Sequence, residues 1–264
     1  MPSKKALLSK IINPLSGRTV IVPMDHGVTD GPIPGLLKMD ETIKRVKEGG
    51  ADAIIIHKGI FKLYKEVIGD LPALIHISAS TGMGVSLKKV LVATAKEVKN
   101  LGAAGVSVHL NIGNQYEPEM LRDLGIVARE CEEEGLPLLA MMYPRNIIDG
   151  KIINYNDAEK VGHAARLAAE LGADIVKVPY TGDAKSFGEV VRGCPIPVVI
   201  AGGAKGSEEA MLSSIRDCVL AGAAGVSVGR NVFQSEDVSG MVKKVREAVY
   251  DAAAVSANAK TSRN

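Results

Sequence analysis

Four segments of the chain share one pattern, and this repeat constrains the fold more than any other feature. They read 49-GGADAIIIH-57, 101-LGAAGVSVH-109, 171-LGADIVKVP-179 and 221-AGAAGVSVG-229. In each, a Gly-Ala pair follows a helical pattern and leads into a short strand rich in β-branched residues. The glycine before the alanine fits the left-handed position that ends a helix. Repeated helix-to-strand transitions predict parallel strands joined by right-handed crossovers.

The rest of the chain continues this alternation. Strands are predicted at residues 19–23, 52–57, 73–77, 105–110, 137–143, 173–178, 196–200 and 224–228. Helices are predicted near residues 40–49, 85–100, 117–134, 157–171, 183–192, 207–221 and 239–252. Eight such units predict an α/β fold, a closed (β/α)8 TIM barrel, which needs about 250 residues. An open doubly wound sheet is the alternative, but it would want a GxGxxG turn where the chain reads MDHGVTDG.

The two ends of the chain add to this plan. Residues 1–12 are expected to form an extra N-terminal helix that plugs the bottom of the barrel, and residues 253–264 to form a frayed tail. No linker divides residues 1–264, so we expect one domain. The N-terminus is too polar for a signal peptide, and no run approaches about 20 apolar residues. Together these features predict a cytoplasmic protein without a membrane partner.

Charge and cysteine content exclude several functions. The 32 basic and 30 acidic residues are interspersed, and aromatic residues make up 3% of the chain with no Trp. Neither a basic face nor a base-stacking surface is evident, so nucleic acid is not expected as a partner. The cysteines Cys131, Cys194 and Cys218 lack any CxxC or zinc spacing. A reduced intracellular chain follows.

Lys177 is the unusual residue within the repeat. Aligned on the Gly-Ala pair, its position holds Ile55, Ser107 and Ser227 in the other segments. A lysine inside an apolar strand is costly unless its amine has a task, and Schiff-base catalysis uses such an amine. The alternative is a lysine paired with Asp25 or extended to the barrel rim.

Active sites of TIM barrels lie at the carboxyl ends of the strands, and the polar residues gather there. Tyr143, before Pro144 and Arg145, could act as a general acid, although a packing tyrosine is the plainer interpretation. Asp25 could accept a proton from a substrate hydroxyl, although it could also cap a turn. Side-chain alternation allows Asp25, Tyr143 and Lys177 to point inward together.

A phosphate site is predicted at the last two strand ends. Gly202 and Gly203 follow one strand, and Gly229 and Arg230 follow the next. Loops at these places commonly bind phosphate through bare backbone N–H groups, and Arg230 or Lys205 could add charge. Plain turn glycines are the alternative.

Three histidines lie in or after neighbouring strands: His57, His76 and His109. They could in principle bind a metal, but neutral core histidines are commoner and no HxH or HxxE pair is present. No metal is therefore expected.

Five motifs together resemble the archaeal class I aldolase family. They are 23-PMDHG-27, 143-YPR-145, 174-DIVKVPYTGD-183, 200-IAGGAK-205 and 226-VSVGRNVFQ-234, spread over nearly the whole chain. The resemblance implies that Lys177 forms the Schiff base, Tyr143 donates a proton and Asp25 accepts one, without metal or organic cofactor. It further implies a substrate site made of Asp25, His26, Gly27, Val28, Thr29, Tyr143, Pro144, Arg145, Lys177, Gly202, Gly203, Gly229 and Arg230.

Within the family, further pieces resemble the branch that performs transaldol transfer. These are 20-VIVPMDHGV-28, 57-HKGI-60, 75-IHISAST-81, 109-HLNIG-113 and 139-LAMMYPR-145. The implied reaction moves a hydroxyacetone unit from 6-deoxy-5-ketofructose 1-phosphate to L-aspartate semialdehyde, in aromatic amino acid biosynthesis. The implied assembly is a homo-oligomer, with a decamer as one form to expect. Ala204, where proline is usual, and Pro179 depart from the family pattern.

Three other functions stay open at this stage. The first is a class I fructose-1,6-bisphosphate aldolase that uses the same three residues. The second is a thiolase-like relative that acts on a phosphorylated dione with coenzyme A. The third, from a different class, is a barrel without catalytic activity that binds a sugar phosphate as a sensor.

Overall fold

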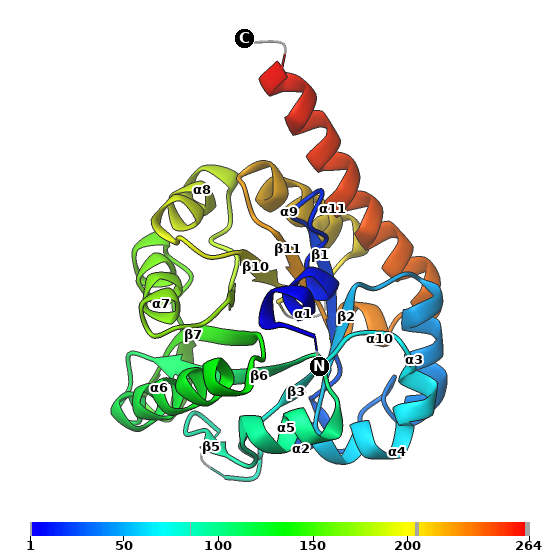
Figure 1. Cartoon of the computed structure of the whole chain (residues 1–264). Helices are drawn as coiled ribbons and strands as arrows, with labels where there is room; N and C mark the ends of the chain where they lie inside the picture. The colour runs from blue at the N-terminus through cyan, green and yellow to red at the C-terminus, as the bar shows by residue number, and fades with distance from the viewer. Residues whose placement is uncertain (1, 85, 204–205, 262–264) are drawn as a thin grey trace.

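In the part of the chain that the computed structural model describes, eight parallel strands close into a barrel (Figure 1). This part is residues 2–84, 86–203 and 206–261, with side chains as far as residue 252. The barrel strands are β1 (Thr19–Pro23), β2 (Ala53–Ile56), β3 (Ala73–His76), β6 (Gly105–Ile112), β7 (Leu138–Ile148), β9 (Ile175–Val178), β10 (Val198–Ala201) and β11 (Gly225–Ser227). They pair in the order β6-β3-β2-β1-β11-β10-β9-β7, and β7 pairs again with β6. The TIM barrel is confirmed and the open sheet is wrong.

Helices surround the barrel and connect its strands. They are α2 (Gly27–Asp30), α3 (Met39–Glu48), α4 (Lys58–Ile68), α5 (Ala95–Leu101), α6 (Glu117–Glu134), α7 (Ala158–Glu170), α8 (Ala184–Gly193), α9 (Glu208–Leu220), α10 (Arg230–Phe233) and α11 (Val238–Thr261). The backbone is helical as far as Thr261, within the stretch 253–264 for which the sequence predicted a frayed tail. Residues 262–264 lie outside the described residues. Among the described helices, none combines the length and apolar character that a bilayer crossing needs.

Two apolar layers follow from the alternation of side chains along each strand. Val176 and Val178 pack outward in the large core between strands and helices. Ile175 belongs to a second core inside the barrel, with Leu139 of the neighbouring strand. The predicted parity of β9 and β7 is therefore confirmed, and it directs Lys177 to the inside.

The N-terminal helix α1 (Lys4–Ile11) closes one end of the barrel (Figure 1). Its Ser3 cap accepts a hydrogen bond from Ala6 N, which begins the helix. Ile11 and Ile12 join the inner core, and Thr19 Oγ1 donates to Ile11 O at 2.6 Å. The predicted plug is confirmed.

The predicted glycine exits are also confirmed. The φ angles at Gly50, Gly102, Gly172 and Gly222 are 85°, 81°, 95° and 105°. A side chain at these positions would be strained, so glycine here is a requirement of the backbone.

The region after β3 differs from the prediction of one helix over residues 85–100. Short strands β4 (Ser78–Ala79) and β5 (Val90–Leu91) pair antiparallel there, and the helix α5 begins only at Ala95. Thr94 marks this start, because its side chain accepts from Glu97 N at 3.2 Å. The helix α4 was not predicted, although Phe61 and Ile68 form its buried face.

A hairpin extends β7 beyond the barrel, which the sequence analysis also missed. Strand β8 (Lys151–Asn154) pairs antiparallel with the end of β7, so that Ile147 faces Ile152. Asp149 and Gly150 form the turn, with φ of 51° and 73°. An Asp-Gly pair with two positive φ angles is a strong hairpin signal.

Candidate active site

A cavity of about 610 Å³ opens at the carboxyl ends of the barrel strands. Most of the predicted site residues line it: His26, Tyr143, Pro144, Arg145, Lys177, Gly202, Gly203, Gly229 and Arg230. Lys205 lies outside the described residues. The structure therefore brings together side chains and loops from both halves of the barrel.

Lys177 lies in the wall of this cavity. It is 6% exposed, and it is in register with Met141 of β7 on one side and Val199 of β10 on the other. The described ion pairs of Asp25 are with His26 and His76, not with Lys177. The alternative of a lysine paired with Asp25 is therefore wrong in this conformation.

Tyr143 lies near Lys177, two residues beyond its register partner on β7. Its ring contacts two groups: the His109 ring, with centroids 4.8 Å apart, and the Arg145 guanidinium, whose Cζ is 4.3 Å from the tyrosine centroid. The ring is half-buried and lines the cavity. These contacts fix its direction.

Asp25 lies just beyond β1, in a group of histidines. Its Oδ1 is 3.8 Å from His26 Nδ1, and its Oδ2 is 3.7 Å from His76 Nε2. Burial alone would raise the pKa of this carboxyl, but it is lowered to about 2 by His76 and His26, which are charged once acid protonates them, and by Lys177. Asp25 is thus ionised at neutral pH. It is not among the residues that line the cavity wall.

The histidines near Asp25 are fixed and neutral. His76 is buried, and its Nδ1 lies 2.7 Å from Ser107 Oγ. Burial lowers the pKa of His76 to about 4, against the opposing effect of Asp25. The His57 ring contacts that of His76 edge-on, with centroids 5.2 Å apart. Within the described residues, no group of three His, Cys, Asp or Glu side chains could hold a metal.

Asn111 is a member of the site whose role the sequence analysis did not foresee. It is fully buried, and its Nδ2 donates to Leu87 O at 2.8 Å. Its Oδ1 lies 3.0 Å from His109 Nε2 and accepts from Arg145 Nη1 at 3.4 Å. Asn111 therefore positions the two groups that hold Tyr143. It is in register with Tyr143, a signal that strand pairing alone could supply.

The loops after β10 and β11 form one wall of the cavity. Gly203 has a φ of 65°, and Gly229 is so closely packed that a Cβ there would lie 2.7 Å from Pro23 O. Asn231 joins the two loops, because its Nδ2 donates to Gly202 O at 3.0 Å. Arg230 is exposed at the start of α10. Backbone N–H groups that no side chain covers, together with one cation, can bind an anion.

Besides Asp25, three predicted residues do not line the cavity: Gly27, Val28 and Thr29. They form α2, where Val28 is 37% exposed and Thr29 Oγ1 donates to Ser80 O at 3.1 Å. Their place in the predicted site came from the resemblance to the aldolase family. The geometry supports a structural role in the loop after β1.

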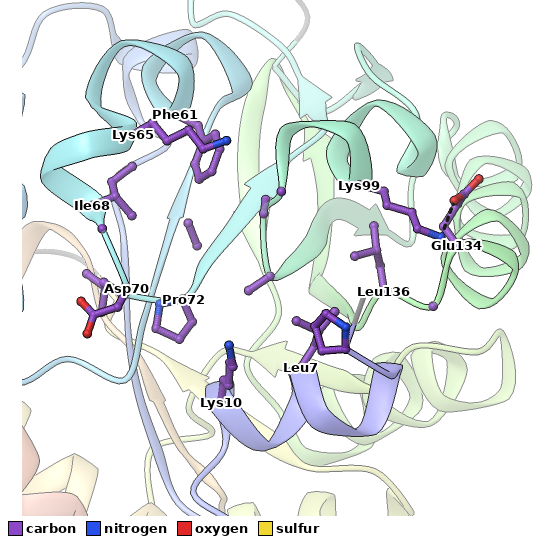
Figure 2. A pocket seen from close by; sticks show the side chains of 18 of the residues that line it. Leu7, Lys10, Phe61, Lys65, Ile68, Asp70, Pro72, Lys99, Glu134 and Leu136 are labelled. Atoms are coloured by element: carbon purple, nitrogen blue, oxygen red, sulfur yellow. Dashed lines mark ion pairs between the residues drawn. The ribbon is translucent and has the colours of Figure 1, made fainter.

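A second cavity of about 600 Å³ lies at the opposite end, beside α1 (Figure 2). None of the predicted site residues lines it. Two of its cations are already bound: Lys65 Nζ donates to Leu101 O at 2.7 Å, and Lys99 Nζ is 3.0 Å from Glu134. The open end of the barrel is therefore the better candidate for the active site.

Several known proteins are similar to this chain in both fold and sequence. A 2-amino-3,7-dideoxy-D-threo-hept-6-ulosonate synthase of Archaeoglobus fulgidus is 44% identical over 95% of this chain and 92% of its own length. A 2-amino-4,5-dihydroxy-6-oxo-7-(phosphonooxy)heptanoate synthase of Streptomyces griseus is 37% identical, over 89% and 85%.

A solved archaeal fructose-1,6-bisphosphate aldolase, with its catalytic lysine bound to a carbinolamine, superposes with a TM-score of 0.84. It is 30% identical and covers 94% of this chain and 99% of its own. The model of the DeoC/LacD family aldolases matches residues 19–235. The chain belongs to this family of aldolases, as the five sequence motifs predicted.

Proposed function

We propose that this protein transfers a hydroxyacetone unit from 6-deoxy-5-ketofructose 1-phosphate to L-aspartate semialdehyde through a Schiff base on Lys177. The observation that carries the proposal is the buried position of Lys177 in a cavity that it shares with Tyr143 and the glycine loops. The product is 2-amino-3,7-dideoxy-D-threo-hept-6-ulosonate.

In the first half of the reaction, the amine of Lys177 attacks C5, the ketone beside the methyl group, and loss of water gives an iminium. Asp25 takes the proton of the hydroxyl on C3, which becomes the aldehyde of hydroxypyruvaldehyde phosphate. The C3–C4 bond breaks, its electron pair moves to the iminium to form an enamine, and hydroxypyruvaldehyde phosphate leaves. Asp25 is ionised at neutral pH and so can accept a proton, and it lies beside His26, which lines the cavity.

In the second half, the enamine carbon attacks the aldehyde of L-aspartate semialdehyde. Tyr143 supplies the proton to the alkoxide that develops, and water then releases the product and Lys177. The contacts of Tyr143 with His109 and Arg145 support this role, because they hold the phenol in one direction. The loops with Gly202, Gly203, Gly229 and Arg230 bind the donor phosphate. No metal or organic cofactor enters these steps.

The similar proteins support the same choice of acceptor. Both synthase names describe a seven-carbon 2-amino acid. The synthase of the dideoxy product is 44% identical to this chain, and the other synthase is 37% identical. A four-carbon amino aldehyde joined to a three-carbon ketone accounts for both skeletons. The absence of phosphate in the dideoxy product fits transfer of hydroxyacetone.

The test is a mass-spectrometric product assay with the donor, with and without L-aspartate semialdehyde. We expect the seven-carbon amino keto acid only when both substrates are present. Cleavage of the donor without any condensation product would contradict the proposal.

The second candidate is a class I fructose-1,6-bisphosphate aldolase, which the 30% identity and TM-score of 0.84 to the solved enzyme support. Its substrate carries a phosphate at each end. This enzyme would cleave fructose 1,6-bisphosphate to two triose phosphates. The higher sequence identity to the synthase, 44%, favours the synthase over this aldolase.

We also infer a homo-oligomer in the cytoplasm, with a decamer as the expected form. Exposed isoleucines on the β7–β8 hairpin support an interface: Ile147, Ile148, Ile152 and Ile153. Light scattering in solution tests it, and a mass of one chain, 27.8 kDa, would contradict it.

A further inference from the structure

Arg145 is a half-buried cation in the wall of the cavity, and no ion pair joins it to a carboxylate among the described residues. Its guanidinium lies over the Tyr143 ring, Nη1 donates to Asn111 Oδ1 at 3.4 Å, and Nε is buried without a hydrogen-bond partner. Burial lowers the pKa of Arg145, because the charged form loses solvent. A buried guanidinium that lacks a carboxylate is unfavourable unless a ligand supplies the anion.

The surroundings of Arg145 add positive charge rather than compensate it. Lys89 Nζ donates to the neutral Ser80 hydroxyl, and burial together with the charge of Arg145 lowers the pKa of Lys89 to about 8. Arg230 acts on Arg145 in the same sense. The positive charges of Arg145 and Lys89 on this side of the barrel mouth favour an anionic ligand.

The guanidinium is also held in place before any ligand arrives. Asn111 Nδ2 donates to Leu87 O, so Asn111 Oδ1 is turned toward Arg145 and His109. His109 Nε2 must then carry the hydrogen of the 3.0 Å contact, and burial lowers the pKa of His109, which keeps it neutral. A fixed, planar guanidinium suits a carboxylate, which it can bind through two parallel hydrogen bonds.

The position of Arg145 indicates which substrate it meets. Strand β9, with Lys177, lies between β10, which leads to the glycine loops, and β7, which carries Tyr143 and Arg145. In L-aspartate semialdehyde three C–C bonds separate the aldehyde from the carboxylate, a span of about 4 Å. Arg145 Cζ lies 4.3 Å from the centre of the Tyr143 ring. An acceptor whose aldehyde meets the phenol can therefore place its carboxylate at Arg145.

We propose that Arg145, positioned by Asn111, binds the carboxylate of the acceptor aldehyde and so selects an acidic acceptor. This assignment rests on the proposed transaldol function. It separates two anion sites on either side of Lys177: the glycine loops for the phosphate of the donor, and Arg145 for the carboxylate of the acceptor.

The experiment compares two acceptors of equal chain length, L-aspartate semialdehyde and uncharged butanal, in the wild type, Arg145→Lys and Arg145→Met. We expect the ratio of their kcat/KM values to fall at least tenfold in Arg145→Met, and by less in Arg145→Lys, which keeps the charge. A merely structural role would lower both rates alike and leave the ratio unchanged. Arg129→Met, on the outer surface of α6 with a side chain that is 68% exposed, is the matched control.

Two results would overturn the assignment. One is an unchanged acceptor ratio in Arg145→Met. The other is a loss of borohydride-trapped donor adduct as large as the loss of transfer, which would place Arg145 at the donor phosphate. If the wild type forms no seven-carbon product at all, the proposed function itself fails, so the two failures remain distinguishable. Circular dichroism of both variants shows whether they fold.

Discussion

At the scale of single residues, His76 makes the stability of the barrel depend on pH. Its folded pKa of about 4 lies below the unfolded value of 6.5, so the unfolded chain binds more protons between these limits. The contribution of His76 to stability is therefore present above pH 6.5 and is lost as the pH falls toward 4. As the pH falls across this window, we expect the free energy of unfolding of His76→Gln to decrease by about 2 to 3 kcal/mol less than that of the wild type.

The measurement is urea unfolding at pH 7 and pH 4.5. His163→Gln, at an exposed position of α7, is the control and should follow the wild type. An equal acid loss in His76→Gln and the wild type would show that His76 does not stay neutral in the fold. In the wild type, the depressed pKa of Asp25, about 2, confines its own loss to between about pH 4 and 2. Because His76 is the largest of the charges that lower this pKa, His76→Gln also moves part of the Asp25 loss to higher pH.

Prediction at this scale was mixed. Lys177 could be found because it is the one charged residue at a repeat position that otherwise holds Ile55, Ser107 and Ser227. Asn111 and Ser107 could be placed on a strand, but their hydrogen bonds to His109 and His76 depend on strand register. Strand register is set by the folded sheet, and the sequence of each strand alone does not give it.

At the scale of elements, the loop after β11 depends on Gly229. A Cβ at this position would lie 2.7 Å from Pro23 O and 2.8 Å from His26 Cε1, so Gly229→Ala must displace the loop. We expect a stability loss of about 1–3 kcal/mol, together with a higher KM for the phosphorylated donor. Gly59→Ala is the control, since a Cβ there meets nothing within 4 Å. An unchanged KM in Gly229→Ala would contradict the phosphate assignment.

A second prediction at this scale concerns the plug helix α1. Ile11 is fully buried in the inner core, whereas Leu15, just beyond the helix, is 97% exposed. Ile11→Ala should lower the free energy of unfolding by about 2–5 kcal/mol, measured by chemical denaturation. Leu15→Ala should change it by no more than about 0.5 kcal/mol. Equal effects of the two changes would mean that α1 does not close the barrel in solution.

Elements without a clear period were the ones that the sequence analysis missed. The β7–β8 hairpin carries isoleucines on both of its faces, so its strands show no polar alternation, although Asp149-Gly150 was a usable turn signal. Residues 85–100 combine a helical period with Val90, Leu91 and Val92, and pairing with Ser78 decides in favour of a strand. Tertiary pairing overrides local propensity in such segments.

At the scale of the whole molecule, four Gly-Ala exits and the alternation in the rest of the chain predicted eight parallel units. The closing pair β6–β7 is the feature that distinguishes the barrel from the open sheet. Closure placed the carboxyl ends of β7, β9, β10 and β11 around one cavity. The site follows from the fold, while the identity of the acceptor depends on side chains such as Arg145.

The most direct test is borohydride reduction of the protein with 6-deoxy-5-ketofructose 1-phosphate, followed by peptide mass spectrometry. We expect a reduced three-carbon adduct without phosphate on Lys177, absent from Lys177→Met and present in Lys185→Met, which changes an exposed lysine of α8. No adduct on Lys177 would contradict the Schiff base. No adduct with this donor, but a phosphate-bearing three-carbon adduct with fructose 1,6-bisphosphate, would contradict transaldol transfer and favour the bisphosphate aldolase.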